Sequence, residues 1–222
     1  MARIGGSLLR AGREPLCALL GALAQVHTGV LVVPGGGVFD ARVRHEAARL
    51  RLGDTAAHWM AVLAMDAYGW LLADLLDIAQ PVTDPAEARR VAAQRRLPVL
   101  LPFSLLRARD DLPHSWDVTS DSIAAWVAAV CGASALILLK DVDGVYPADP
   151  LRERDLALLD HVDAGEAARL GVVDAYFPRA LARFFGGGEC WVLNGLCPER
   201  VSGLLRGEIP RGTRVRCSPA GA

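Results

Sequence analysis

Short apolar runs alternate with stretches of helical character along the whole chain, and this alternation limits the possible folds most strongly. Runs that predict buried strands are Leu31–Val33, Leu97–Phe103, Ala135–Leu139, Cys190–Leu193 and Thr213–Arg216. Strands that alternate with helices form a mainly parallel sheet covered on both faces. We therefore predict an α/β fold, a three-layer αβα sandwich with a mainly parallel central sheet, in one domain over residues 1–222.

Helix signals fall between these runs. Pro15, next to Glu14, suits a helix start, and an apolar stripe at helical spacing follows: Leu16, Leu19, Leu20, Leu23 and Val26. The stretch from Asp40 to Ala79 is predicted to be helical, in segments broken near Gly53 and Gly69. Capping patterns predict further helices that open at Asp84-Pro85, at Thr119-Ser120 and at Asp163, the last of them closed by Gly171.

Charge and hydropathy exclude several classes of protein. The net charge is −1 with mixed signs, so nothing predicts binding to nucleic acid or to an anionic membrane. The longest apolar stretch, Trp59 to Ala79, contains three aspartates and is not expected to span a membrane. Met1 to Gly12 resembles a strand and a glycine loop rather than a signal peptide. We expect a cytoplasmic protein.

Metal and disulfide frameworks are not predicted either. The five cysteines contain no C-x-x-C pair, and we expect them to be reduced and mostly in the core. His45-Glu46 lacks the second histidine of a zinc protease helix, because Arg49 occupies that position. We predict no protein-held metal site. Met1 leaves only four residues before Gly5, which is short for a central strand and suggests a natural start upstream.

Glycine-rich turns carry the strongest chemical signal. They are Gly5-Gly6-Ser7, Gly35-Gly36-Gly37 and Asp143-Gly144. Glycines at strand ends let the backbone approach a ligand, and their N–H groups can form an anion site. Each turn alone is more often an ordinary turn, and none matches a P-loop or G-x-G-x-x-G pattern. At the carboxyl ends of several parallel strands, however, they would form a ligand crevice.

Lys140 is the only lysine in a chain with 24 basic Lys and Arg residues. It lies between an apolar run and the acidic turn Asp141-Val142-Asp143-Gly144. A compact ammonium in this position suits a phosphate group. The alternative is that lysine is simply rare here and this one has no special role.

Five segments, in order along nearly the whole chain, resemble the motifs of the amino acid kinase superfamily. They are Gly5–Leu9, Val33–Gly37, Thr119–Ala125, Asp141–Tyr146 followed by Asp149-Pro150, and Val192–Gly195. The group includes uridylate, acetylglutamate, aspartate and carbamate kinases, isopentenyl phosphate kinase and the fosfomycin-resistance kinase. The Asp-Val-Asp-Gly-Val-Tyr segment is a fairly specific signal, and the glycine turns gain weight from the shared order.

The resemblance implies transfer of the γ-phosphoryl group of ATP, with Mg²⁺, to a carboxylate, carbamate or phosphate of a small-molecule acceptor. It implies an acceptor side over roughly residues 1–115 and a nucleotide side over roughly 116–222, in a homo-oligomer. Gly5, Gly6 and Ser7 would cradle the transferring phosphate. The acceptor would face Gly35, Gly36, Gly37 and Ser120, and the nucleotide would lie along Lys140, Asp141, Asp143, Gly144, Val145, Tyr146 and Asp149.

The catalytic charges depart from the family pattern. Arg3 and Arg179 occupy the positions where the family typically has lysines, and Lys140 could supply the missing ammonium. Asp121 would orient these cations, or would only cap its helix. Four arginines after the acceptor loop would form a solvated face or a basic wall for a phosphorylated acceptor: Arg42, Arg44, Arg49 and Arg51.

The acceptor is the least determined part of the prediction. Small size, the Lys140–Gly144 segment and Val173-Asp174 resemble the branch of the aminomethylfuran phosphate kinase of methanofuran biosynthesis, which acts on a phosphomonoester. A uridylate or amino-acid kinase is an alternative. Another is a nucleotide- or oxyanion-binding storage protein without turnover, which the arginine substitutions favour.

Overall fold

The computed structural model describes residues 1–25, 29–148, 153 and 156–217. One sheet contains the eight described strands in the order β3-β4-β2-β1-β5-β7-β8-β6. They are β1 (Ala2–Ile4), β2 (Val32–Pro34), β3 (Ala79–Val82), β4 (Leu97–Leu100), β5 (Ala135–Lys140), β6 (His161–Asp163), β7 (Glu189–Asn194) and β8 (Thr213–Arg216). All neighbouring pairs are parallel except β7 and β8. The predicted sheet type is confirmed.

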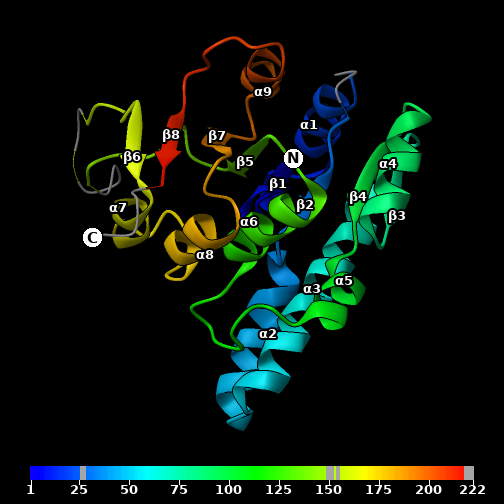
Figure 1. Ribbon diagram of the computed structural model, residues 1–222, viewed down its shortest axis with the longest axis vertical. Helices are drawn as coiled ribbons and strands as arrows, with labels where there is room; N and C mark the ends of the chain where they lie inside the picture. Colours follow the sequence, from blue (N-terminus) through cyan, green and yellow to red (C-terminus); the bar gives the residue numbers. More distant parts are fainter. Residues whose placement is uncertain (26–28, 149–152, 154–155, 218–222) are drawn as a thin grey trace.

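Helices cover both faces of this sheet (Figure 1). They are the 3-10 helix η1 (Gly6–Ala11) and the α-helices α1 (Arg13–Ala24), α2 (Gly37–Leu50), α3 (Asp54–Asp74), α4 (Pro85–Ala93), α5 (Pro102–Arg109), α6 (Ser120–Cys131), α7 (Ala164–Arg169), α8 (Phe177–Phe184) and α9 (Pro198–Leu205). The predicted starts of α4, α6 and α7 are confirmed, whereas α5, α8 and α9 were not predicted and α2 begins at Gly37 rather than at Asp40. Asp84, for example, accepts hydrogen bonds from the N–H groups of Ala86 and Glu87 at the start of α4.

Two buried clusters, one on each face, hold the layers together. Side chains of β5 alternate between them: Leu136 and Leu138 pack in one cluster, and Ile137 and Leu139 in the other. The first cluster contains most of α6, including Trp126, and the second contains the leucines of α1. Apolar residues buried on both faces are typical of a parallel sheet, so the three-layer αβα prediction is confirmed.

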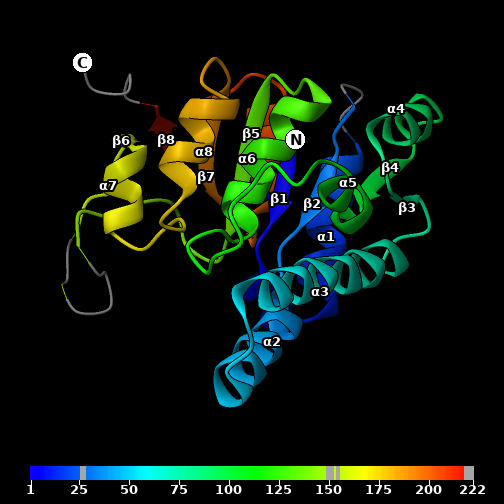
Figure 2. The ribbon, with the colours of Figure 1, turned by 60° about the horizontal axis from the view of Figure 1, so that its bottom comes forward.

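The α2–α3 hairpin positions the site. Its two helices pack along each other and extend away from one end of the sheet (Figures 1 and 2). The predicted break near Gly53 is confirmed, since Gly53 is the N-cap of α3. The loop between the helices is short, and Arg51 takes a left-handed φ of 53° at the end of α2. No helix in the described part of the chain is long and apolar enough to cross a membrane.

Three predicted boundaries are wrong. Gly69 lies inside α3 and does not break it. A Cβ at this position would come within 2.8 Å of Leu101 Cδ2, so the glycine allows Leu101 to pack closely against the helix. The helical stretch ends at Asp74, and residues 79–82 form the edge strand β3, which the sequence did not predict. The strand predicted to reach Phe103 ends at Leu100, because Pro102 begins α5.

Other differences are smaller. The short strand β6 was not predicted, and Val26 of the predicted stripe lies outside the described residues. The cysteines are not mostly in the core: Cys190 is buried and the other four are partly exposed. Two of these lie at element ends, since Cys131 ends α6 and Cys197 precedes α9.

Candidate functional site

The first two glycine loops touch each other at the centre of the sheet. The N–H of Gly5 donates to Leu139 O at 2.8 Å, and the N–H of Gly35 donates to Ile4 O at 2.8 Å. A Cβ on Gly6 would lie 2.4 Å from the backbone nitrogen of Gly37, whose φ is +61°. Only glycines allow this approach. The loops therefore form one continuous backbone surface after β1 and β2.

A buried charge cluster lies beside the loops. Asp121 on α6 receives Lys140 Nζ at 3.0 Å and Arg3 Nη1 at 3.3 Å. Arg3 also donates through Nη2 to Ser120 Oγ. All of these side chains are largely shielded from solvent, and Asp121 is 4% exposed. Three of the four predicted catalytic residues are thus together, and Asp121 does more than cap a helix.

Burial and pairing oppose each other at this cluster. Burial alone would raise the pKa of Asp121, but the charges of Arg3 and Lys140 outweigh it and the pKa is lowered. Burial lowers the pKa of Lys140, against the attraction of Asp121. The result is an ionised carboxylate between two cations. Such cations suit the charge that develops on a transferring phosphoryl group.

Asp174 belongs to the Val173-Asp174 segment of the sequence analysis, but its contacts with the start of α6 were not predicted. Its carboxylate accepts hydrogen bonds from the N–H and Oγ1 of Thr119 and from the N–H and Oγ of Ser122. It therefore caps α6 from a distant loop. Thr119 is the N-cap residue, but its own side chain accepts no hydrogen bond from the N–H groups of the first turn. Burial, and then the Asp121 charge, raise the pKa of Asp174. The backbone N–H of Asp174 in turn bonds Asp121.

The predicted nucleotide residues make a second set of contacts. Ser7 Oγ donates to Asp141 Oδ1 at 2.8 Å, which joins the first glycine loop to the end of β5. Asp143 accepts from Asn194 at 3.0 Å and from Arg200 at 2.7 Å, and Arg211 lies 3.2 Å away. The bond from Asn194, together with Arg200, lowers the pKa of Asp143. These carboxylates hold the loop after β5 in place.

The remaining predicted residues differ in position. A Cβ on Gly144 would lie 2.6 Å from Thr213 Oγ1, which accepts from the N–H of Val145. Val145 is fully buried and its N–H is engaged by Thr213, so the predicted contact of Val145 with a nucleotide stays a prediction. Tyr146 is partly exposed after this turn, and Asp149 lies outside the described residues.

Arg179 does not join the charge cluster. It is exposed on α8, and no ion pair links it to Asp121 within the described part of the chain. The two cations that meet Asp121 in the structure are Arg3 and Lys140. A catalytic role for Arg179 stays a prediction.

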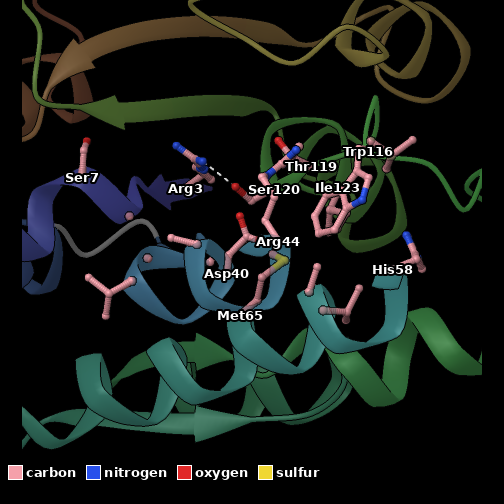
Figure 3. Close-up of a pocket in the computed structure, with 18 of the residues that line it drawn as sticks. Arg3, Ser7, Asp40, Arg44, His58, Met65, Trp116, Thr119, Ser120 and Ile123 are labelled. Carbon is pink, nitrogen blue, oxygen red and sulfur yellow. Dashed lines mark hydrogen bonds between the residues drawn. The ribbon is translucent and has the colours of Figure 1, made fainter. Parts of the chain in front are cut away.

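A cavity of about 340 Å³ opens beside the cluster, between the loops, the α2–α3 hairpin and the start of α6 (Figure 3). Arg3, Ser7, Gly6, Gly36, Gly37 and Ser120 line its inner end. Further along, Asp40 and Arg44 come from α2, and His58 and Met65 from α3. Its volume is within the range of sites for small molecules.

The four arginines of α2 divide between the two predicted roles. Arg42 and Arg49 pair with Glu46 and Arg51 is exposed at the helix end, so these three belong to a solvated face. Arg44 lines the cavity, and its guanidinium lies 4.0 Å from the centre of the Trp116 ring. The predicted basic wall therefore reduces to Arg44, with Arg3 and Arg10 at the inner end.

Sequence comparisons agree with this arrangement. The model of the amino acid kinase family matches residues 2–183. The [5-(aminomethyl)furan-3-yl]methyl phosphate kinase of Methanocaldococcus jannaschii is 30% identical over 213 residues, which cover 96% of this chain and 95% of that protein. A uridylate kinase of Pyrobaculum neutrophilum is 25% identical over 209 residues, or 88% of this chain and 89% of that protein.

Solved structures show the same fold. The uridylate kinase from Archaeoglobus fulgidus has a TM-score of 0.72 at 22% identity, over 96% of this chain and 98% of that one. The isopentenyl phosphate kinase of T. acidophilum, in a product complex, has a TM-score of 0.63 at 19% identity, over 97% of this chain and 98% of that one.

Proposed function

The chain belongs to the amino acid kinase family and is a kinase, and we propose that it transfers the γ-phosphoryl group of ATP to a small phosphomonoester. The observation that carries this proposal is the Arg3–Asp121–Lys140 cluster beside two touching glycine loops. The loops offer backbone N–H groups to phosphates, and the cluster offers two cations held by one carboxylate.

The proposed reaction is an in-line transfer. An oxygen of the acceptor phosphate forms a bond to the γ-phosphorus while the bond to the β–γ bridging oxygen breaks, so the products are a diphosphate ester and ADP. The transition state is loose, and catalysis rests on position and charge. Arg3 and Lys140 would face the equatorial oxygens of the moving group, and Asp121 would keep both cations in place.

Mg²⁺ would enter with ATP. Asp121 is already engaged by two cations and does not suit a metal, whereas Asp141 is an exposed carboxylate beside Ser7. Asp141 could share the ion with the ATP phosphates, as one carboxylate does in many Mg²⁺ sites. Bound Mg²⁺ would neutralise charge on the β- and γ-phosphates.

For the acceptor, we propose a compound similar to the one named for the Methanocaldococcus relative, an aminomethylfuran-methyl phosphate, in a cofactor pathway such as methanofuran biosynthesis. The cavity volume and Arg44 beside the inner loops support a small phosphorylated molecule. The predicted self-association and cytoplasmic location stay predictions.

An acceptor panel tests the proposal. ADP release from Mg-ATP would be measured with [5-(aminomethyl)furan-3-yl]methyl phosphate, isopentenyl phosphate, UMP, glutamate and aspartate. We expect the highest kcat/KM with the furan phosphate. A preference for UMP would overturn the furan acceptor in favour of a uridylate kinase. A preference for an amino acid would overturn the phosphomonoester assignment itself in favour of a carboxylate kinase. ATP binding without ADP release on any acceptor would instead support a storage protein.

A further inference from the structure

The proposed phosphoryl transfer does not use the two carboxylates that line the cavity, Asp54 and Asp40, and Asp40 is the one beside the glycine loops. It lies on the first turn of α2 and points into the cavity opposite Arg3 and Ser120 (Figure 3). Its side chain packs against the second glycine loop, since a Cβ on Gly36 would lie 2.2 Å from Asp40 Cβ. The position is therefore fixed by the same loop that would hold the acceptor.

The carboxylate of Asp40 stands apart from the other side chains of the cavity. Within the part of the chain that the structure describes, its carboxylate makes no hydrogen bond and no ion pair. Arg44, one turn further along α2, stacks on Trp116 instead. Burial raises the pKa of Asp40, although Arg44 and Arg3 act in the opposite direction. A partly buried carboxylate with no partner is unfavourable unless a ligand supplies a cation or a donor.

The charges of the cavity suit a ligand of mixed sign. Arg3, Arg10 and Arg44 line the cavity together with two aspartates, Asp40 and Asp54. Arg3 and Arg10 already pair with Asp121 and Asp141, which lie outside the lining, so Arg44 and Asp40 are the charged groups beside the loops that remain for a ligand. A phosphomonoester without an amine would leave Asp40 without a partner.

Distance separates the two aspartates. At 1.5 Å per residue, Asp40 is roughly 4.5 Å along α2 from Gly37, at the inner loop. Gly37 contacts Tyr68 on α3, and Asp54 is roughly 21 Å along α3 from that level. A ring the size of furan, with its phosphate on the loops, reaches Asp40 and not Asp54.

We propose that Asp40 binds the ammonium of the acceptor, so that the site selects phosphorylated primary amines over phosphomonoesters that end in a neutral group. This inference rests on the proposed function, because it assumes that the acceptor phosphate lies at the glycine loops. It assigns a specificity role to a residue outside the Arg3–Asp121–Lys140 cluster.

Two matched acceptors test it: [5-(aminomethyl)furan-3-yl]methyl phosphate and the same compound with a hydroxymethyl in place of the aminomethyl group. The wild-type protein should prefer the amine by about 10- to 100-fold in kcat/KM, the factor for one charge-assisted hydrogen bond. Asp40→Asn should lose this preference because its kcat/KM for the amine falls, while its kcat/KM for the hydroxymethyl compound changes less than threefold. Glu46→Gln, which removes a carboxylate from the outer face of α2, should keep the preference.

Calorimetric binding of both compounds separates failure of the inference from failure of the proposed function. Tighter binding of the amine that depends on Asp40 would support the inference even if no phosphoryl transfer occurs. Turnover of both compounds at equal kcat/KM would leave the kinase proposal standing and overturn the inference. Equal losses for both compounds in Asp40→Asn, or a higher Mg²⁺ requirement for both, would also overturn it, because the carboxylate would then serve the fold or the metal.

Discussion

The two walls of the cavity differ in how far their charges are already satisfied. On the α6 wall, Asp121 meets Arg3 and Lys140, and Asp174 accepts four hydrogen bonds from Thr119 and Ser122. On the α2–α3 wall, Asp40 has no such partners among the described residues, and the Arg44 guanidinium stacks on a ring. The first wall is organised before any ligand arrives, and the second is arranged to receive one.

This difference matches two separate tasks. Groups that stabilise a transition state act best when they are fixed in advance, because no reorganisation is then needed during the reaction. Groups that select a substrate gain most when the correct ligand alone satisfies them. Substitutions on the α6 wall should therefore affect kcat with every acceptor, and those on the α2 wall should change the choice of acceptor.

The largest effect is expected for Asp121→Asn. Without the carboxylate, two buried cations lose their shared partner, and both would shift from the transferring phosphoryl group. We expect kcat to fall about 10³-fold, roughly 4 kcal/mol, while KM for ATP changes only a few-fold. Steady-state kinetics below the melting temperature of the variant would measure this. Activity within twofold of wild type would mean that the α6 wall is structural only.

Lys140→Ala should follow closely. Loss of one positioned cation is expected to raise the barrier by about 2.7–4 kcal/mol, or about 10²- to 10³-fold in kcat. Lys140→Arg should restore activity only in part, because a planar guanidinium needs more room beside Asp121 than an ammonium does. Equal kinetics for wild type and both variants would make the single lysine an accident of composition, with Arg3 and Arg179 left as the catalytic charges.

Gly6→Ala tests the contact between the glycine loops that both walls share. The new Cβ would lie 2.4 Å from a backbone nitrogen, so the loops must separate. We expect a loss of about 1–3 kcal/mol in the free energy of unfolding and at least about tenfold in kcat/KM. Gly21→Ala is the matched control: nothing lies within 4 Å of its Cβ inside α1, and it should stabilise by about 0.5–1 kcal/mol. Equal free energies of unfolding for Gly6→Ala and Gly21→Ala would contradict the contact between the loops.

Asp174→Ala tests whether the α6 wall depends on its distant cap. Four hydrogen bonds at the start of α6 are lost, and we expect unfolding to become easier by about 1–2 kcal/mol. If Asp174 is also a positioning residue, the variant should lose about tenfold in kcat with KM for ATP unchanged, because the start of α6, which carries Asp121, loses its anchor. A change in stability with unchanged kcat would mean that Asp174 stabilises the fold and does not position the catalytic groups.

The smallest effect is expected for the pH dependence of stability that His58 contributes on the α2–α3 wall. Burial, then the neighbouring His114, lowers the pKa of His58 to about 4, from 6.5, with Asp110 opposing. The unfolded state binds more protons in this window, so this contribution to stability is complete above about pH 6.5 and is lost as the pH falls toward 4. His58→Gln should reduce the loss of unfolding free energy between pH 6.5 and pH 4 by roughly 1–2 kcal/mol, as measured by denaturant melts across this range. An unchanged profile would show that other groups set it.

Sequence predicted the α6 wall far better than the α2 wall. Gly5, Gly6, Asp121 and Lys140 stand in local patterns with a chemical meaning, and the structure gathers them. The capping contacts of Asp174 were not predicted because its partners lie 52 to 55 residues away, and a carboxylate that caps a helix from another loop leaves no local pattern. The stacking of Arg44 on Trp116 depends in the same way on how a loop folds back over α2.

The fold shows the same division. Capped helices and buried apolar strands were predicted nearly to their ends, because short-range propensities agree with tertiary packing there. Gly69 suggested a break by composition, yet the close approach of Leu101 makes glycine the residue that fits inside a continuous helix. The short edge strand β3 depends on its pairing with β4, which sequence periodicity does not show.

The most direct test of the account is to follow the phosphorus atoms. Wild-type protein, Mg-ATP and [5-(aminomethyl)furan-3-yl]methyl phosphate would be mixed and observed by ³¹P NMR, with Lys140→Ala and Asp40→Asn in parallel. We predict that new diphosphate doublets grow in equal amount to ADP with wild type, are nearly absent with Lys140→Ala, and grow slowly with Asp40→Asn. ADP with inorganic phosphate and no diphosphate ester, or equal rates in all three proteins, would contradict the assignment of catalysis to one wall and selection to the other.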